Sequence, residues 1–175
     1  MAEKSFSPFP VLNTERLILR KLVSSDDHQI FALRSNEKIN RYLGRKLCGS
    51  IDEAKDFIQL IESNIQKNDS LYWAITLIES NELVGTICLY NFSPINSAAE
   101  IGYELLPEFQ GRGIMQESVA LVIKYAREEI KLASIEAYPH SDNINSLKLL
   151  EKLNFRKQGP IDNSLIKFIF ADRLS

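Results

Sequence analysis

Apolar residues recur at intervals of three and four in several parts of the chain, the spacing that places side chains on one face of a helix. The clearest stripe begins after Ser50, which together with Glu53 has the pattern of a capping box. A shorter stretch follows the N-cap candidates Ser24 to Asp27. We therefore predict four helices, at about residues 28–34, 51–65, 114–130 and 143–153.

Shorter runs that are rich in apolar and β-branched residues indicate strands between these helices. Two of them flank the short polar connection at residues 79–82, which favours an antiparallel hairpin. We predict seven strands, at residues 17–23, 71–78, 83–91, 98–106, 134–138, 155–158 and 165–171. A mixed sheet covered by helices buries both of its faces, so the element order predicts an α/β fold.

Composition excludes several classes of protein. The chain has 175 residues, of which 45% are hydrophobic and 25% charged, as in soluble globular proteins. Its formal net charge is -2, whereas nucleic-acid binding favours a clear basic excess. We find no apolar run long enough for a membrane span or a signal peptide. Cys48 and Cys88 lie far apart without metal-ligand spacing, so we expect neither a zinc site nor a disulfide framework. We therefore expect no metal and a protein of the reducing cytoplasm.

The segment with the clearest chemical meaning contains Gly111 and Gly113, between a predicted strand and a predicted helix. Glycines allow a tight turn, and the free N–H groups and dipole of the following helix favour an anion such as a diphosphate. The dinucleotide-binding motif GxGxxG is not matched, because Gln116 stands at its third glycine position, and the phosphate-loop motif GxxxxGK[ST] is not matched either. A dinucleotide or nucleoside-triphosphate site is therefore disfavoured. Two glycines that only close a tight connection explain the same spacing equally well.

The segment Gln110-Gly111-Arg112-Gly113-Ile114 resembles the Gln/Arg-x-x-Gly-x-Gly/Ala motif of the GCN5-related N-acetyltransferases, the GNAT family. Met115 stands where Gly or Ala is usual, a variation similar to the RimJ/RimL-like branch. Other segments resemble that branch in the same order: Thr14-Glu15-Arg16-Leu17-Ile18-Leu19-Arg20, Ala99-Glu100-Ile101-Gly102-Tyr103, Asn143-Ile144-Asn145-Ser146, and Leu150-Glu151-Lys152-Leu153-Asn154-Phe155.

The resemblance implies one GNAT domain over residues 1–175, with a core at about 14–172. It implies a mostly antiparallel, twisted sheet with a V-shaped splay between the fourth and fifth strands. Acetyl-CoA is the implied cosubstrate, and a primary amine attacks its thioester directly in a ternary complex. A homodimer is common in the family. The implied acetyl-CoA-binding residues are Leu105, Leu106, Gln110, Gly111, Arg112, Gly113, Ile114, Met115, Gln116, Asn143 and Ser146.

Acetyl transfer requires an oxyanion donor, a base for the amine and a proton donor for the departing thiolate. The resemblance assigns the first role to the backbone N–H of Leu105. Glu100 is our candidate base, and Glu104, four residues along the same strand face, is the second. Ser146 is the candidate thiolate donor, and Asn143 the candidate ligand of the pantetheine amide. Core packing, solvation and helix capping are the structural alternatives for these residues.

The acceptor is less well indicated. RimL-like enzymes carry a longer segment, with acidic and aromatic residues that help form the acceptor site, where this chain has residues 159–164. The segment here lacks the glutamate, a departure that bears on both the base assignment and the transfer of the ribosomal-protein substrate to this chain. Arg41, Arg45 and Lys46 form a basic cluster in a loop that lines the acceptor groove in the family, although solvation also explains it. We expect a protein or peptide N-terminal amine, or a small-molecule amine. A non-catalytic acetyl-CoA sensor is the alternative.

Overall fold

The computed structural model describes residues 5–171, which form an eight-stranded sheet in the order β1-β2-β3-β4-β5-β6-β8-β7. Neighbouring strands are antiparallel except β5 and β6, which are parallel, so the sheet is mixed and mostly antiparallel, as predicted. The strands are β1 (Leu12–Asn13), β2 (Leu17–Lys21), β3 (Leu71–Leu77), β4 (Leu83–Ser93), β5 (Ala98–Leu105), β6 (Ser134–Ala137), β7 (Arg156–Pro160) and β8 (Ile166–Ala171).

The predicted helices are confirmed within a few residues at their ends. The helices are α1 (Asp27–Ser35), α2 (Glu37–Asn40), α3 (Ile51–Gln66), α4 (Ile114–Glu128) and α5 (Ile144–Lys152). The sequence analysis missed α2 and β1, which span four and two residues and are too short to show a hydrophobic period. At the start of α3, Ser50 accepts a hydrogen bond from the N–H of Glu53, whereas the Glu53 side chain accepts from Gly49.

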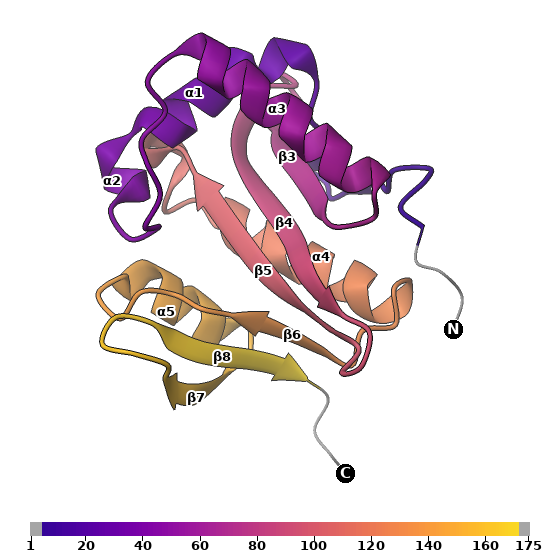
Figure 1. Ribbon diagram of the computed structural model, residues 1–175, viewed down its shortest axis with the longest axis vertical. Coiled ribbons are helices and arrows are strands. Elements are labelled where there is room, and N and C mark those ends of the chain that lie inside the picture. The colour runs from indigo at the N-terminus through magenta and orange to yellow at the C-terminus, as the bar shows by residue number, and fades with distance from the viewer. Residues whose placement is uncertain (1–4, 172–175) are drawn as a thin grey trace.

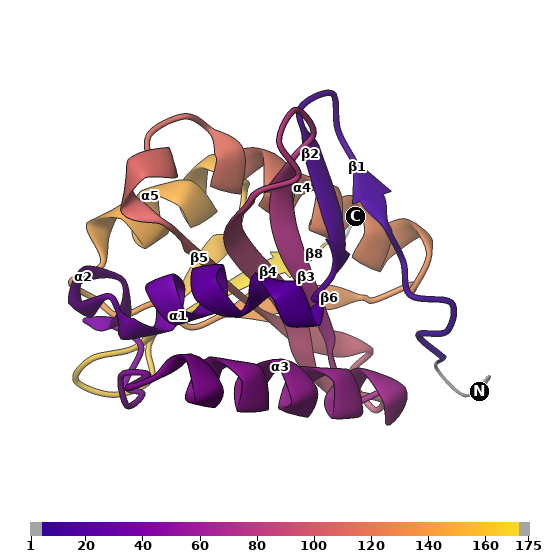
Figure 2. The same ribbon diagram turned by 90° about the horizontal axis from the view of Figure 1, so that it is seen from above.

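Helices cover both faces of the sheet, as Figure 2 shows, with α1 and α3 on one side and α4 and α5 on the other. Alternate residues of β3 supply both faces. Trp73 and Ile75 are buried in the cluster that includes the apolar face of α4, and Tyr72 and Ala74 in the cluster that includes α1 and α3. The sheet therefore separates two apolar layers.

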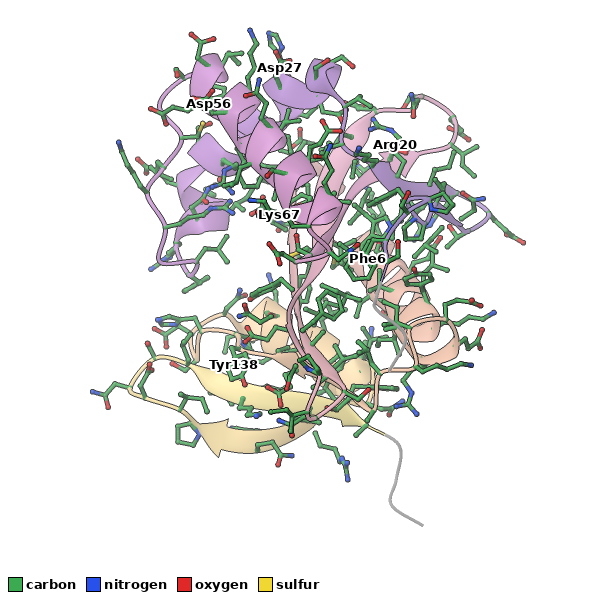
Figure 3. The ribbon with its side chains drawn as sticks, turned by 45° about the vertical axis from the view of Figure 1, so that its right-hand side comes forward. Phe6, Arg20, Asp27, Asp56, Lys67 and Tyr138 are labelled. Atoms are coloured by element: carbon green, nitrogen blue, oxygen red, sulfur yellow. The ribbon has the colours of Figure 1, made fainter. Side chains whose placement is uncertain are left out.

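The segment before β1 packs against the sheet. Phe6 is buried beside Phe92, with ring centroids 5.2 Å apart, and its N–H donates to the side chain of Asn68 (Figure 3). Within residues 5–171, no helix is long and apolar enough to cross a membrane.

The sheet opens between β5 and β6. These are the fourth and fifth of the predicted strands, since β1 was not among the predictions. These two strands pair only through Ala98, Ala99 and Glu100 of β5. Beyond that point β5 continues beside β4 as far as Leu105, whereas β6 continues beside β8. Figure 1 shows the two strands meeting at one end and parting toward the other. The predicted V-shaped splay is therefore confirmed, and it leaves one edge of β5 open.

Candidate active site

The turn between β5 and α4 has a backbone suited to binding an anion. Gly111 and Gly113 have φ values of 76° and 74°, in the left-handed region that glycine enters without strain. Gly113 is the N-cap of α4 and has no side chain to cap the helix. The first helical N–H with a backbone partner is that of Glu117, which donates to Gly113 at 3.0 Å. The preceding N–H groups and the helix dipole fit a diphosphate.

Arg16, at the end of the β1–β2 connection, holds this turn in place. Its Nη2 donates to the carbonyl of Arg112 at 2.9 Å, and its Nε pairs with Glu117 Oε2 at 2.7 Å. Thr14 donates its hydroxyl to the other oxygen of Glu117. Thr14 and Arg16 belong to a motif of the sequence, but no role could be predicted for them, because their partner Glu117 lies about a hundred residues away in the chain.

A groove of about 780 Å³ lies beside the glycine turn, between the end of β5 and α5. Most of the predicted acetyl-CoA-binding residues line it: Leu105, Gln110, Gly111, Gly113, Ile114, Met115, Gln116, Asn143 and Ser146. Leu106 does not: it is buried in the core, and its N–H donates to Val84. Arg112 does not either, since its guanidinium lies 5.4 Å over the ring of Phe109.

Basic residues that the sequence analysis missed also line this groove. Lys148 and Lys152 are one turn apart on α5, and Lys38 belongs to α2. The spacing of four between the α5 lysines could have identified them as one face of the helix that follows Asn143. Glu104 and Glu151 also line the groove, so the three lysines leave it with a small excess of positive charge, which favours phosphate groups.

Asn143 and Ser146 meet at the start of α5. Asn143 is the N-cap, and its side-chain oxygen accepts from the N–H of Ser146 at 3.3 Å, so helix capping is one of its roles. The hydroxyls of Ser146 and Tyr103 are 2.7 Å apart. Burial raises the pKa of Tyr103 to about 12, which keeps its hydroxyl protonated. The pair can donate a proton into the groove.

The open edge of β5 brings backbone groups into the same groove. The N–H of Leu106 points toward β4, where Val84 accepts it at 2.9 Å. Because successive residues of a strand direct their backbone groups to opposite edges, those of Leu105 point toward the gap between β5 and β6. Gln110 donates its side-chain amide to the Leu105 carbonyl at 3.0 Å. The N–H of Leu105 is thus directed to the side that the groove occupies.

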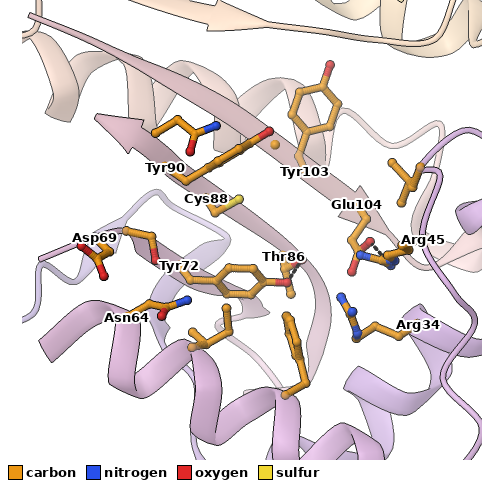
Figure 4. Close-up of a pocket in the computed structure, with 16 residues that line it drawn as sticks. Arg34, Arg45, Asn64, Asp69, Tyr72, Thr86, Cys88, Tyr90, Tyr103 and Glu104 are labelled. Atoms are coloured by element: carbon orange, nitrogen blue, oxygen red, sulfur yellow. Dashed lines mark hydrogen bonds and ion pairs between the residues drawn. The ribbon is translucent and has the colours of Figure 1, made fainter. Parts of the chain in front are cut away.

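A second cavity, of about 580 Å³, lies on the other face of the sheet, under α3 (Figure 4). Its walls come from α3, from β3, β4 and β5, and from the loop that carries Leu43 and Arg45. The two cavities share three lining residues, which are Leu43, Tyr103 and Glu104. One end of β5 is therefore the common boundary of two cavities.

Glu104 is the carboxylate at this boundary. It is 8% exposed, and its Oε2 accepts from Arg45 at 2.5 Å. Its Oε1 is buried without a hydrogen-bond partner among the described residues, an arrangement that costs free energy unless a donor is supplied. Glu100 lines neither cavity and accepts from Asn91 at 3.0 Å. Four residues of strand place the Cα atoms of the two glutamates about 13 Å apart.

Several other polar side chains lie apart from the cavities. Tyr138, labelled in Figure 3, donates its hydroxyl to Glu136 at 2.5 Å and lines neither cavity. Of the basic cluster, Arg45 reaches Glu104, whereas Arg41 and Lys46 are exposed. Within the part of the chain that is described, no group of three or more His, Cys, Asp or Glu side chains could hold a metal ion.

Comparison with known proteins connects this geometry to a family. The model of the acetyltransferase (GNAT) domain matches residues 16–156. The chain is 36% identical over 151 residues to a Bacillus subtilis (strain 168) protein called "Uncharacterized N-acetyltransferase YoaA", covering 86% of this chain and 85% of that protein.

Two solved structures share the fold at low sequence identity. RimL, a ribosomal L7/L12 alpha-N-protein acetyltransferase, has a TM-score of 0.80 and 22% identity, covering 93% of this chain and 94% of that chain. Spermidine N-acetyltransferase from Vibrio cholerae, in complex with CoA and spermine, has a TM-score of 0.78 and 22% identity, covering 90% and 96%.

Proposed function

This chain belongs to the GNAT family and is an acetyltransferase, and on that premise we propose that each of the two cavities described above holds one substrate. The groove beside α4 holds acetyl-CoA, and the cavity under α3 holds a primary amine. The observation that carries this proposal is that the cavities meet at Leu43, Tyr103 and Glu104. An amine in one can reach a thioester in the other without either substrate leaving its site.

The groove has what acetyl-CoA requires. The uncapped N–H groups that follow Gly111 and Gly113 bind the diphosphate, and the dipole of the fifteen-residue helix α4 adds to their attraction. Lys148 and Lys152 supply charge for the phosphates. The pantetheine chain then runs along the open edge of β5, where Asn143 also lines the groove.

The chemistry follows from the groups around the boundary. The amine nitrogen attacks the thioester carbon, and the resulting oxyanion accepts a hydrogen bond from the N–H of Leu105. When the carbon–sulfur bond breaks, the thiolate takes a proton from the Ser146–Tyr103 hydroxyl pair, 2.7 Å apart, and the pair regains its proton from solvent. The raised pKa of Tyr103, about 12, keeps that proton in place until the thiolate forms.

The amine must give up a proton, and we assign its acceptor to Glu104, directly or through water. Glu104 lies at the boundary of the cavities and has one oxygen without a partner within residues 5–171, whereas Glu100 lies where β5 and β6 are still paired. A base for this step must be within hydrogen-bond reach of the nitrogen or one water away from it. Glu100, about 13 Å along the strand, is the less well placed of the two.

The acceptor is the α-amine of a peptide or of a small molecule. The named acceptors of the structural neighbours include a ribosomal protein α-amine for RimL, and the Vibrio cholerae enzyme is named for spermidine. The α-amine fits this chain better because two arginines balance the two carboxylates, Asp69 and Glu104, among the charged side chains that line the acceptor cavity, which leaves no net negative charge to attract a polyamine.

Two measurements test the proposal. Calorimetry tests the binding of CoA and acetyl-CoA, and release of the CoA thiol is followed over a panel of amines. We expect micromolar or tighter binding and amine-dependent release. Tight binding without release for any amine would instead indicate a non-catalytic sensor, and no heat of binding would overturn the proposal.

The base assignment has a matched pair of variants. Glu104→Gln should lower turnover by about a hundredfold or more, the usual contribution of general base catalysis, with little change in acetyl-CoA affinity. Glu100→Gln removes an equal charge from the same strand face and should leave turnover within about twofold. The reverse result would return the role to Glu100.

A further inference from the structure

The cavity under α3 contains an arginine for which the proposed mechanism has no use. Arg34 lies in the last turn of α1 and lines the cavity. Figure 4 shows its guanidinium directed inward, near Tyr72 and Glu104. It stacks on Phe57, with its central carbon 3.7 Å from the ring centroid. This contact satisfies the face of the guanidinium and leaves its N–H edge for another partner.

No hydrogen bond or ion pair among residues 5–171 uses the guanidinium of Arg34. Glu104, the nearest carboxylate of the cavity wall, is already bound to Arg45 at 2.5 Å, and Arg45 is also fixed by Asn40. Tyr72 donates its hydroxyl to Thr86 at 3.0 Å. These contacts occupy Arg45, the Oε2 of Glu104 and the Tyr72 hydroxyl without engaging the Arg34 guanidinium, and the other oxygen of Glu104 is the one assigned to the amine.

Half-burying a guanidinium without an acceptor is unfavourable, and the surroundings increase the cost. Burial, and secondarily the neighbouring charge of Arg45, lower the pKa of Arg34 from its usual value. Two arginines and one carboxylate, Glu104, line this end of the cavity, so positive charge is in excess there. The other carboxylate of the lining, Asp69, is exposed and lies at the opposite end, as Figure 4 shows. A ligand carboxylate would supply the missing acceptor and the missing negative charge.

We propose that Arg34 binds a carboxylate of the acceptor, so that this enzyme acetylates amines that carry an acidic group near the reacting nitrogen. This inference rests on the proposed function, since it assumes that the acceptor occupies the cavity under α3. Arg34 then determines specificity, while Glu104 takes the proton of the amine. The planar guanidinium, held on Phe57, binds a carboxylate through two parallel hydrogen bonds.

Paired acceptors that differ only in the acidic group test the inference. One pair is a free α-amino acid and its carboxamide. The other pair is a tripeptide amide that begins with aspartate and its counterpart that begins with asparagine. The two pairs distinguish a small acidic amine from an acidic peptide N-terminus. In at least one pair we expect kcat/KM of the carboxylate to exceed that of the amide by about tenfold or more, the usual value of a charge-assisted hydrogen bond.

The variants separate recognition from general damage. Arg34→Gln should abolish this preference, and Arg34→Lys should retain part of it, because a lysine keeps the charge but not the planar fork. Lys46→Gln removes an equal charge from an exposed position in the nearby loop and should leave the preference unchanged. If Arg34 only supported Glu104, its loss would slow both members of a pair equally, and that outcome would overturn the inference.

A binding measurement keeps the inference distinct from the proposed function. Ligand-observed NMR follows the N-acetylated acid and N-acetylated amide of each pair on the CoA-bound protein. Arg34-dependent binding of the acid without any acetyl transfer would support the inference and refute the proposed function. Acetyl transfer without a carboxylate preference in either pair, or a preference that survives Arg34→Gln, would refute the inference alone.

Discussion

The contact of Arg16 with the glycine turn leads to a quantitative expectation for acetyl-CoA affinity. Glu117 lies three residues into α4, a rise of about 4.5 Å, and an anion bound to the first N–H groups lies about 3 Å beyond them, so the two charges are roughly 8 Å apart. Arg16 neutralises this carboxylate through a 2.7 Å ion pair. In Arg16→Gln, the repulsion between Glu117 and one phosphate charge would be about 1–2 kcal/mol at an effective dielectric constant of 20–40. Affinity should then fall by about five- to thirtyfold.

Calorimetry with acetyl-CoA on a double-mutant cycle checks this expectation. Glu117→Gln alone should bind about as well as the unaltered protein, and Arg16→Gln with Glu117→Gln should recover most of the lost affinity. Added salt should reduce the defect of the single Arg16 variant. Unfolding in denaturant is the control, where the loss of an exposed pair costs about 1 kcal/mol. A double variant as weak as Arg16→Gln would refute the electrostatic reasoning and leave loop geometry as the cause.

Three further predictions concern the turn, the hydroxyl pair and alkaline stability. Gly113→Ala places a side chain at φ 74° and 3.3 Å from Arg16 Nη2, so unfolding in denaturant should show a loss of about 1–2 kcal/mol and calorimetry a weaker acetyl-CoA affinity. Tyr103→Phe should lower kcat by about tenfold or more. Because burial raises the pKa of Tyr103 to about 12, activity of the unaltered enzyme should not decline between pH 8 and 10. A decline in that range that Tyr103→Phe removes would contradict the assignment. Burial raises the pKa of Cys88 from 9.0 to about 12, so above about pH 9 the unfolded chain loses a proton that the folded one keeps. The free energy of unfolding should therefore decrease with rising pH there, less steeply in Cys88→Ala, and an unchanged slope in that variant would refute the assignment.

Periodicity predicted the elements that bury a broad apolar face. The stripes of α3 and α4 carry enough apolar positions to fix both the existence and the inner face of each helix. A single turn such as α2 has no period to detect. The parting of β5 from β6 followed from a family resemblance and not from spacing, because it depends on which neighbour each strand follows beyond Glu100.

The candidate site shows the same division. The glycine turn was recognisable because all of its residues are consecutive. Spacing placed Glu100 and Glu104 on one strand face but could not tell which of them reaches the boundary of the cavities. Arg16 and Arg34 were missed because their meaning depends on partners that are distant in the chain, or absent from it. From charge and local pattern alone, an arginine is predicted to be solvated. Only the fold shows that Arg34 lies in a cavity wall.

The single strand that separates the cavities has a consequence for inhibitor design. Since β5 borders both sites, CoA joined through a short thioether bridge to an amine that carries a carboxylate would occupy both sites at once. Covalent tethering turns the second contact into an intramolecular one, at an effective concentration in the millimolar range or above. Such a conjugate would bind far more tightly than either half, and its bridge length would measure the span between the sites in solution.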